Sequence, residues 1–164
     1  MSKTKENLLA AFAGESQANR KYLAFAKQAD DEGLPQVAKL FRAVAEAETI
    51  HAHAHLRNAG KVGSTLENLQ DAESGEIFEF TKMYPEMIKE AESENAGKEA
   101  KYFSWVGAVE EAHSKLYRKA VEAAGKPAAT DYYVCAVCGY THEGPSDADC
   151  PVCGAAAKAF YKVA

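Results

Sequence analysis

Two Glu-x-x-His motifs lie 62 positions apart in the sequence, Glu48 with His51 and Glu110 with His113. Residues three apart lie on the same face of a helix, so each motif presents a carboxylate and an imidazole together. Mixed carboxylate and imidazole ligands suit iron or manganese, whereas a structural zinc site favours cysteine and histidine. Each motif could therefore supply half of a metal site.

Three further glutamates extend this ligand set. Glu15 falls inside the apolar stripe of an earlier segment, and Glu76 and Glu79 fall in a later one. A Glu from each of two helices, with Glu-x-x-His from each of two others, is the ligand set of a dinuclear carboxylate site in a four-helix bundle. Buried carboxylates are costly unless they are paired or bind metal, and two divalent cations would offset their mutual repulsion. A single Glu-x-x-His is usually a surface pair, so the prediction rests on the whole set.

The four cysteines occur as Cys135-x-x-Cys138 and Cys150-x-x-Cys153, all in the last 30 residues. Without a secretion signal, such clustered pairs indicate metal ligands rather than disulfides. A glycine follows the second cysteine of each pair and allows a tight turn whose amides can point at the sulfurs. The spacing does not distinguish iron, a one-electron carrier, from the zinc of a binding scaffold.

Apolar residues at helical spacing indicate the elements that position these groups. Four helices are expected, over about 4–31, 35–59, 73–95 and 98–124. The inner face of the second helix runs through Val37 and Leu40 towards Glu48. Pro85 should kink the third helix, because proline removes an amide and crowds the preceding turn. Residues 61–72 are expected to be a polar, turn-rich connection, compatible with the long crossover of ferritin-like bundles.

The expected fold is an all-α four-helix bundle of the ferritin-like type with a small C-terminal metal-binding domain. The bundle spans 1–124, a linker 125–130, and the small domain 131–164. So short a domain cannot bury a sufficient core, so a bound metal should hold it together. A shift of 62 positions also superposes the second helix on the fourth, as a duplicated helical hairpin would.

Composition excludes several functions. The net charge of −5 does not favour binding to nucleic acid or to an anionic membrane surface. No apolar stretch approaches the roughly 20 residues that a membrane span needs, so a cytoplasmic protein is expected. No Gly-rich dinucleotide fingerprint precedes a helix, so NAD(P)H would have to act through a separate reductase.

Taken together, these motifs resemble the rubrerythrin family, which joins a ferritin-like di-iron domain to a rubredoxin-like domain. The stretches that carry the resemblance are 11–18, the Glu48-x-x-His51 helix, Glu76-x-x-Glu79 with Met83-Tyr84-Pro85, Glu110-x-x-His113, and 133–154 with its four cysteines. They cover nearly the whole chain. The extra carboxylate of Glu76-x-x-Glu79 is what points to rubrerythrin among ferritin-like proteins.

The resemblance implies two iron ions in a carboxylate centre and one iron ion held by Cys135, Cys138, Cys150 and Cys153. Glu48 and Glu110 would bridge the pair. One iron would be held by Glu15 and would switch between Glu79 when oxidised and His51 when reduced.

The second iron of the pair would be held by Glu76 and His113, and Tyr22 and Tyr84 match tyrosines that hydrogen-bond around the cluster. The implied activity is a non-haem peroxidase that reduces hydrogen peroxide to water and protects against oxidative stress. Its electrons would come from a separate NAD(P)H-dependent reductase or a rubredoxin-type donor, through the cysteine-bound iron.

Other functions stay open at this point. An iron-oxidising or iron-storing protein of the ferritin kind would not need an electron carrier, and a scaffold with a zinc ribbon would lack visible ferric-thiolate colour. Reduction of oxygen is a close neighbour of the peroxidase activity. A homodimer or higher homo-oligomer is expected, and the short linker suggests that the tail serves the partner subunit's site.

Overall fold

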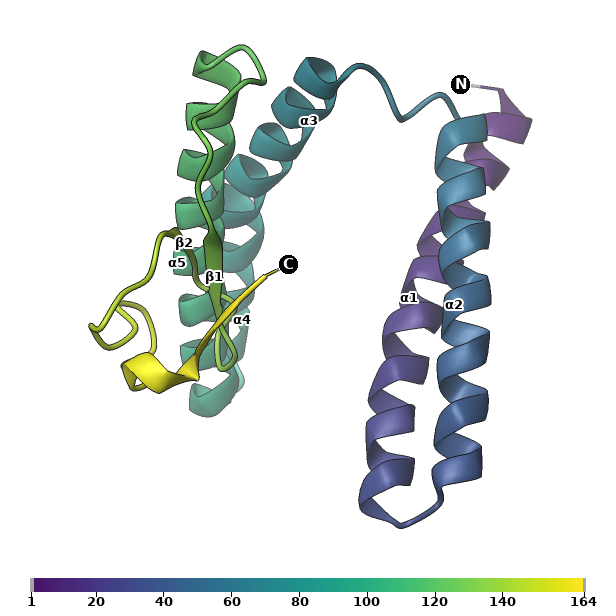
Figure 1. The fold of residues 1–164 in the computed structure, drawn as a ribbon, viewed down its shortest axis with the longest axis horizontal. Helices are drawn as coiled ribbons and strands as arrows, with labels where there is room; N and C mark the ends of the chain where they lie inside the picture. Colours follow the sequence, from purple (N-terminus) through teal and green to yellow (C-terminus); the bar gives the residue numbers. More distant parts are fainter. Residues whose placement is uncertain (1, 164) are drawn as a thin grey trace. The chain divides into compact units, whose positions relative to one another are not determined.

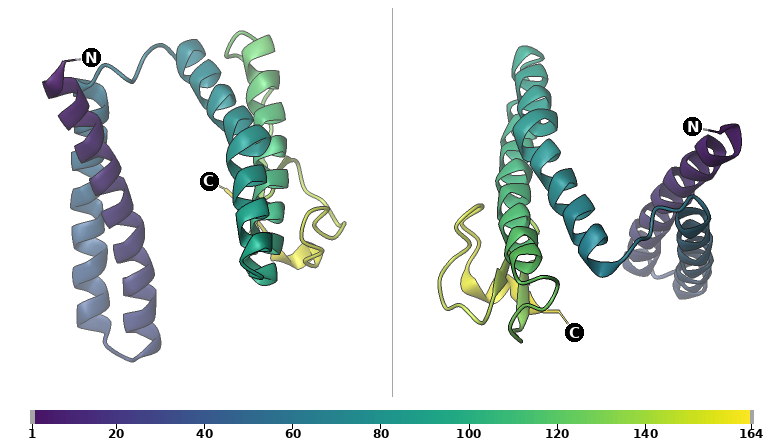
Figure 2. Two further views of the ribbon diagram at one scale, coloured as in Figure 1. Left: turned by 180° about the vertical axis from the view of Figure 1, so that it is seen from behind. Right: turned by 90° about the horizontal axis from the view of Figure 1, so that it is seen from above.

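The computed structural model describes residues 2–163. Its contacts divide the chain into two compact units, one ending at Gly63 and one beginning at Ser64. The first unit is a hairpin of two helices, α1 (Lys3–Asp31) and α2 (Pro35–Asn58). The second unit contains the remaining helices and a small tail with three strands (Figures 1 and 2). Within the described residues, no helix is both long enough and apolar enough to cross a membrane.

Small residues form the contact between α1 and α2. The buried side chains are those of Ala26, Ala29, Ala38, Ala45 and Ala52. Alanine lets two helix backbones approach closely, as small residues do at other helix contacts. The larger apolar residues Val37 and Leu40, expected on the inner face, are instead 41% and 63% exposed. Within this unit the contact of the two helices covers only a narrow strip, which the alanines fill.

The second unit begins with α3 (Thr65–Phe78), which starts earlier than the sequence suggested. Ser64 Oγ accepts from the Glu67 amide at 3.3 Å, and the Glu67 carboxylate accepts from the Ser64 amide at 2.7 Å. This reciprocal capping box fixes the first turn of the helix. The prediction of a turn-rich connection over 61–72 was therefore wrong from Thr65 onwards, because the capping box outweighs the polar composition.

Helical structure continues through a π-helical segment, η1 (Glu79–Met83), into α4 (Tyr84–Ser93). The Tyr84 amide donates to the Glu79 carbonyl, five residues earlier. A π-bulge absorbs the irregularity that Pro85 would otherwise impose on an α-helix. The kink predicted at Pro85 thus takes the form of a wider helical turn that begins at a candidate ligand, Glu79.

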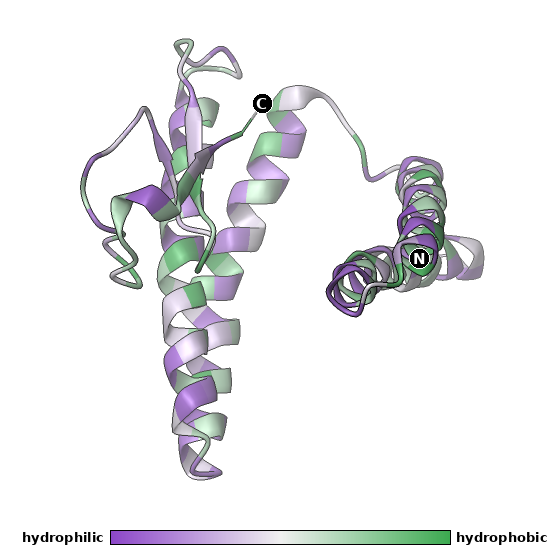
Figure 3. Cartoon of the chain, turned by 60° about the horizontal axis from the view of Figure 1, so that its bottom comes forward, coloured by the Kyte–Doolittle hydropathy of each residue, from purple (hydrophilic) through white to green (hydrophobic). Residues whose placement is uncertain are grey.

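The last helix, α5 (Gly97–Glu122), packs against α3 and α4, and bands of apolar and polar residues alternate along these helices (Figure 3). The tail follows it as β1 (Tyr132–Cys135), β2 (Thr141–Glu143), a 3-10 turn, η2 (Ala157–Ala159), and β3 (Phe160–Lys162). The strands pair antiparallel in the order β2-β1-β3. An ion pair between Lys119 of α5 and Glu143 of β2 joins the tail to the helix.

Candidate metal centres

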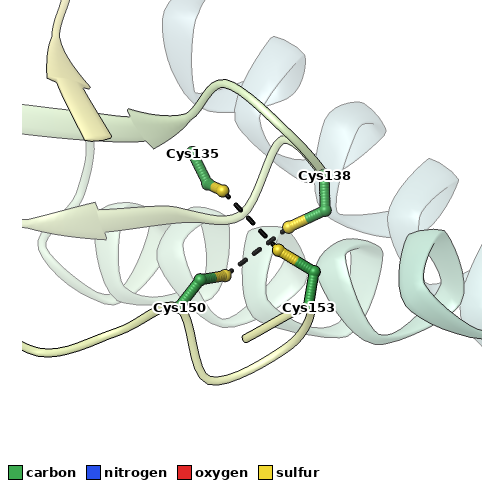
Figure 4. A group of neighbouring side chains, drawn as sticks. All are labelled: Cys135, Cys138, Cys150 and Cys153. Carbon is green, nitrogen blue, oxygen red and sulfur yellow. Dashed lines mark hydrogen bonds between the residues drawn. The ribbon is translucent and has the colours of Figure 1, made fainter. Parts of the chain in front are cut away.

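The four cysteines converge at one end of the tail sheet (Figure 4). Their sulfur atoms all lie within 4.8 Å of one another. The Sγ atoms of Cys135 and Cys153 are 3.8 Å apart, and those of Cys138 and Cys150 are 3.6 Å apart. A tetrahedron with metal–sulfur bonds of about 2.3 Å has edges of about 3.8 Å. The four thiols therefore match the dimensions of a tetrahedral metal site.

Two matching turns build this cysteine site. The amide of Gly139 donates to the Cys135 carbonyl, and the amide of Gly154 donates to the Cys150 carbonyl, both at 2.9 Å. Both glycines have positive φ, 86° and 73°, which residues with a side chain rarely adopt. The next amides in the chain, those of Tyr140 and Ala155, donate to the sulfurs of Cys138 and Cys153. Such amide donors stabilise thiolates around a metal.

A carboxylate and imidazole cluster lies in the second unit. Glu110 and His113 of α5 meet Glu76 of α3, and one ligand atom from each lies within 4.8 Å of the others. His113 Nδ1 is 2.7 Å from Glu110 Oε2 and 3.9 Å from Glu76 Oε1. Helical spacing thus brings Glu110 and His113 together, and packing of α3 against α5 adds Glu76.

The second nitrogen of His113 shows which ring atom faces the cluster. His113 Nε2 lies 3.3 Å from the Gly139 carbonyl and 3.1 Å from Thr141 Oγ1. A carbonyl can only accept, and the Thr141 hydroxyl donates its hydrogen to the same Gly139 carbonyl at 3.1 Å. Nε2 must therefore carry a proton and donate it. Nδ1 is then the ring atom that faces the two carboxylates, and an imidazole held from behind in this way is typical of a metal-ligating histidine.

Burial and like charges raise the pKa values of the carboxyl groups here. Burial, followed by the neighbouring Glu110 charge, raises the pKa of Glu76 to about 7. The same two causes raise the pKa of Glu79. The hydrogen bond to Glu110, opposed by burial, raises the pKa of His113. Carboxylates crowded around an imidazole in this way fit a cation in their midst.

The first unit carries an equivalent cluster. Glu48 and His51 of α2 meet Glu15 of α1, again with ligand atoms within 4.8 Å of one another. His51 Nδ1 is 2.9 Å from Glu48 Oε2. Each unit therefore has a Glu-x-x-His on its second long helix and a glutamate on the helix before it. This is the arrangement expected of the duplicated hairpin.

Three predicted site residues, Glu79, Tyr84 and Tyr22, are not members of these two clusters. Glu79 is not one of the grouped ligands, although its carboxyl group is close enough to sense the charge of Glu110. Burial, followed by the charges of Glu110 and Glu79, raises the pKa of the Tyr84 phenol. Tyr22 packs its ring against Phe25 and Phe41, with centroids 6.3 Å and 6.2 Å away.

Sequence reasoning missed the tail residues that contact His113. Gly139 and Thr141 belong to the turn and strand after Cys138, more than 25 positions along the chain from His113. The glycine was expected to serve only the sulfur turns, and no local pattern marked the threonine. Tyr117, one turn after His113, lines a 620 Å³ cavity together with Glu76, His113 and Thr141.

Two family models match this chain. Residues 6–121 match the rubrerythrin family, and residues 133–161 match the rubrerythrin rubredoxin-like domain. The chain is 35% identical to nigerythrin from Nitratidesulfovibrio vulgaris over 92% of its own length and 81% of that protein. It is 33% identical to rubrerythrin from the same organism, over 93% and 90% of the two chains.

Solved structures agree with these sequence matches. The fully reduced, all-ferrous state of nigerythrin has a TM-score of 0.60 and 33% identity to this protein, covering 99% of this chain and 88% of that one. The mixed-valence state gives a TM-score of 0.59 at 34% identity with the same coverage. The chain belongs to the rubrerythrin family of oxidoreductases, and its carboxylate–histidine clusters and four cysteines correspond to the di-iron site and the rubredoxin-like four-cysteine site of that family.

Proposed function

We propose that this protein is a peroxidase that reduces hydrogen peroxide to water and so protects against oxidative stress. Its electrons arrive through a rubredoxin-type iron in the tail. The observation that supports this most directly is the hydrogen bond from His113 Nε2 to the Gly139 carbonyl. Gly139 follows Cys138 in the chain, so a candidate di-iron ligand and a candidate ligand of the electron carrier are joined by one hydrogen bond and a single residue.

We assign the di-iron ligands to both carboxylate clusters. Glu48 and Glu110 are the proposed bridging ligands, a role carried over from the family, and each stands one helical turn before a histidine. The remaining proposed ligands are Glu15, His51, Glu76, Glu79 and His113, and the four cysteines hold the single iron. The switch of one iron between Glu79 and His51 is carried over from the family. His51, with its side chain 55% exposed, is not confined by packing within its own unit.

Iron bound at these residues would supply the two electrons that reduction of the peroxide O–O bond requires. The protein contributes ligands, their orientation and hydrogen-bond donors. The Tyr84 phenol is the hydrogen-bond donor proposed beside Glu79 and Glu110, and burial together with their charges raises its pKa. Tyr22 is proposed for the matching role in the first unit.

Contacts within the chain support electron delivery to His113 of the same subunit. Thr141 and the Gly139 carbonyl touch His113 of the same chain, and Lys119 of α5 pairs with Glu143 of the tail. We therefore propose that the tail serves its own chain's His113, in place of the exchange between subunits that the short linker suggested. A homodimer or larger oligomer and a separate NAD(P)H-linked reductase remain part of the proposal.

Stopped-flow oxidation of the anaerobically reduced protein tests the function. Mixing with hydrogen peroxide should oxidise the di-iron centre faster than mixing with oxygen at equal concentration. A Glu110→Gln variant, which removes a proposed bridging ligand but leaves all four cysteines, should lose this phase and keep the visible ferric-thiolate absorption. Equal rates with peroxide and oxygen would refute the peroxidase assignment. Rapid accumulation of ferric mineral without turnover would favour iron storage instead.

A further inference from the structure

Thr141 connects the cysteine tail to the carboxylate cluster through a single hydroxyl group. It is the first residue of β2, three positions after Cys138. Its hydroxyl donates to the Gly139 carbonyl at 3.1 Å and lies 3.1 Å from His113 Nε2. Because a hydroxyl has one hydrogen, and that hydrogen points at Gly139, its oxygen can only accept from the imidazole.

We propose that Thr141 is a positioning residue for the metal site: its hydroxyl, fixed by Gly139, holds the His113 ring with Nε2 protonated and Nδ1 directed at the Glu76 and Glu110 carboxylates. The proposal rests on the proposed role of His113 as a ligand. If Thr141 orients His113 on α5, the tail is part of the metal site as well as its proposed source of electrons.

The geometry around the ring supports this role. Nε2 has two acceptors, Thr141 Oγ1 at 3.1 Å and the Gly139 carbonyl at 3.3 Å, and the hydroxyl is the nearer. The Thr141–Gly139 hydrogen bond keeps both acceptors in place together. On one side the ring borders the 620 Å³ cavity that Thr141 and Glu76 also line, so packing there does not hold it. Ring rotation is then restrained by hydrogen bonds at its two nitrogens: Nδ1 to Glu110 at 2.7 Å, and Nε2 to the tail.

The size of the effect follows from what remains after the hydroxyl is removed. Loss of a hydrogen-bond partner behind a metal-ligating histidine typically lowers metal affinity by 10- to 100-fold. In a Thr141→Val variant the Gly139 carbonyl can still accept from Nε2, so we expect the lower end, about a tenfold loss of iron affinity. Thr141→Ser keeps the hydroxyl and should stay within about twofold of the unsubstituted protein.

A third variant distinguishes the effect of the Thr141 hydroxyl from the effect of tail docking. Lys119→Met removes the Lys119–Glu143 ion pair, which also holds the tail on α5, without touching His113. It should leave iron affinity within about twofold, because an exposed ion pair contributes little. If Lys119→Met weakened iron as much as Thr141→Val, tail docking rather than the hydroxyl would position the ring, and the proposal would be wrong.

Two measurements on the full-length protein test the proposal. Competition of a ferrous chelator with the anaerobic, reduced holoprotein gives the affinity of the carboxylate centre, with the cysteine-bound iron followed separately by its Mössbauer signal. In protein labelled with 15N-histidine and substituted with zinc, the Nε2–H resonance of His113 reports its hydrogen bond. It should be protected from exchange in the unsubstituted and serine proteins, and shifted with faster exchange in the valine variant.

An unchanged resonance and unchanged iron affinity in Thr141→Val would overturn the proposal. So would equal losses in the serine and valine variants, because the serine hydroxyl should restore the hydrogen bond. These readouts do not depend on peroxide turnover. A protein that lacks peroxidase activity but shows the tenfold difference would refute the proposed function and leave the role of Thr141 standing.

Discussion

Replacement of Gly107 by alanine tests how tightly α4 packs on α5 beside the site. A Cβ at this position would lie 3.2 Å from Tyr84 Cβ and 3.6 Å from Tyr84 Cγ. Carbon atoms pack best at about 3.5–4.0 Å, so Tyr84 must move by a few tenths of an ångström, roughly the shortfall. Tyr84 Cβ is attached directly to the backbone, so rotation of the phenol does not relieve the contact, and α4 itself must shift. Overpacking of this kind costs about 1–3 kcal/mol.

The matched control is Gly75→Ala in α3, where the new Cβ would meet nothing within 4 Å. Both substitutions gain about 1 kcal/mol of helix propensity, so that gain cancels in the comparison. Gly107→Ala should therefore unfold about 1–3 kcal/mol more easily than Gly75→Ala, measured by urea denaturation with the metal content of both proteins matched. Equal stability of the two variants would refute the argument that Gly107 is required for the approach of Tyr84.

Three further predictions concern electron transfer, pH and helix capping. Mixed oligomers of a Cys138→Ser protein and a Glu110→Gln protein should recover no turnover, because the intact cysteine site and the intact glutamate then lie in different chains; recovered activity would show transfer between subunits. In the metal-free protein the pKa of Glu76 is raised to about 7, so its protonated form favours folding, and stability should fall as pH rises from about 4.5 to about 7. Glu76→Gln should flatten that part of the stability profile, and an unchanged profile would contradict the shift. Ser64→Ala should lower stability by about 1 kcal/mol, because it removes the capping box at the start of α3. The measurement is amide exchange, which should become faster over the first turn of α3. Exchange as slow as in the unsubstituted protein would show that the cap is dispensable.

The sequence was most informative where function depends on local spacing. Glu110 and His113 meet because three residues make almost one helical turn, and that relation holds wherever the helix packs. The cysteine turns are equally local, since each closes within a few residues around a glycine. The presence of these ligand groups could therefore be predicted without knowing how the helices are arranged.

The features that the sequence did not predict depend on tertiary contacts or on competing local signals. The start of α3 was missed because polar composition over 65–72 was given more weight than the Ser64-x-x-Glu67 pattern, although a capping box alone can begin a helix. The exposure of Leu40 was missed because a periodic stripe shows that a face is apolar, not which neighbour covers it. The π-helical turn at Glu79 required knowing how the helix accommodates Pro85.

The contact of Thr141 with His113 shows the limit of sequence reasoning most clearly, and it changes the interpretation of the tail. From sequence, the tail was a separate electron carrier whose short linker suggested that it serves the partner subunit's site. In the structure its turn supplies both acceptors for the outward nitrogen of a candidate iron ligand. A carrier that only delivered electrons could dock and leave, but a residue that orients a ligand has to stay in place. The tail should therefore remain on α5 throughout turnover, and electron delivery should not be limited by docking.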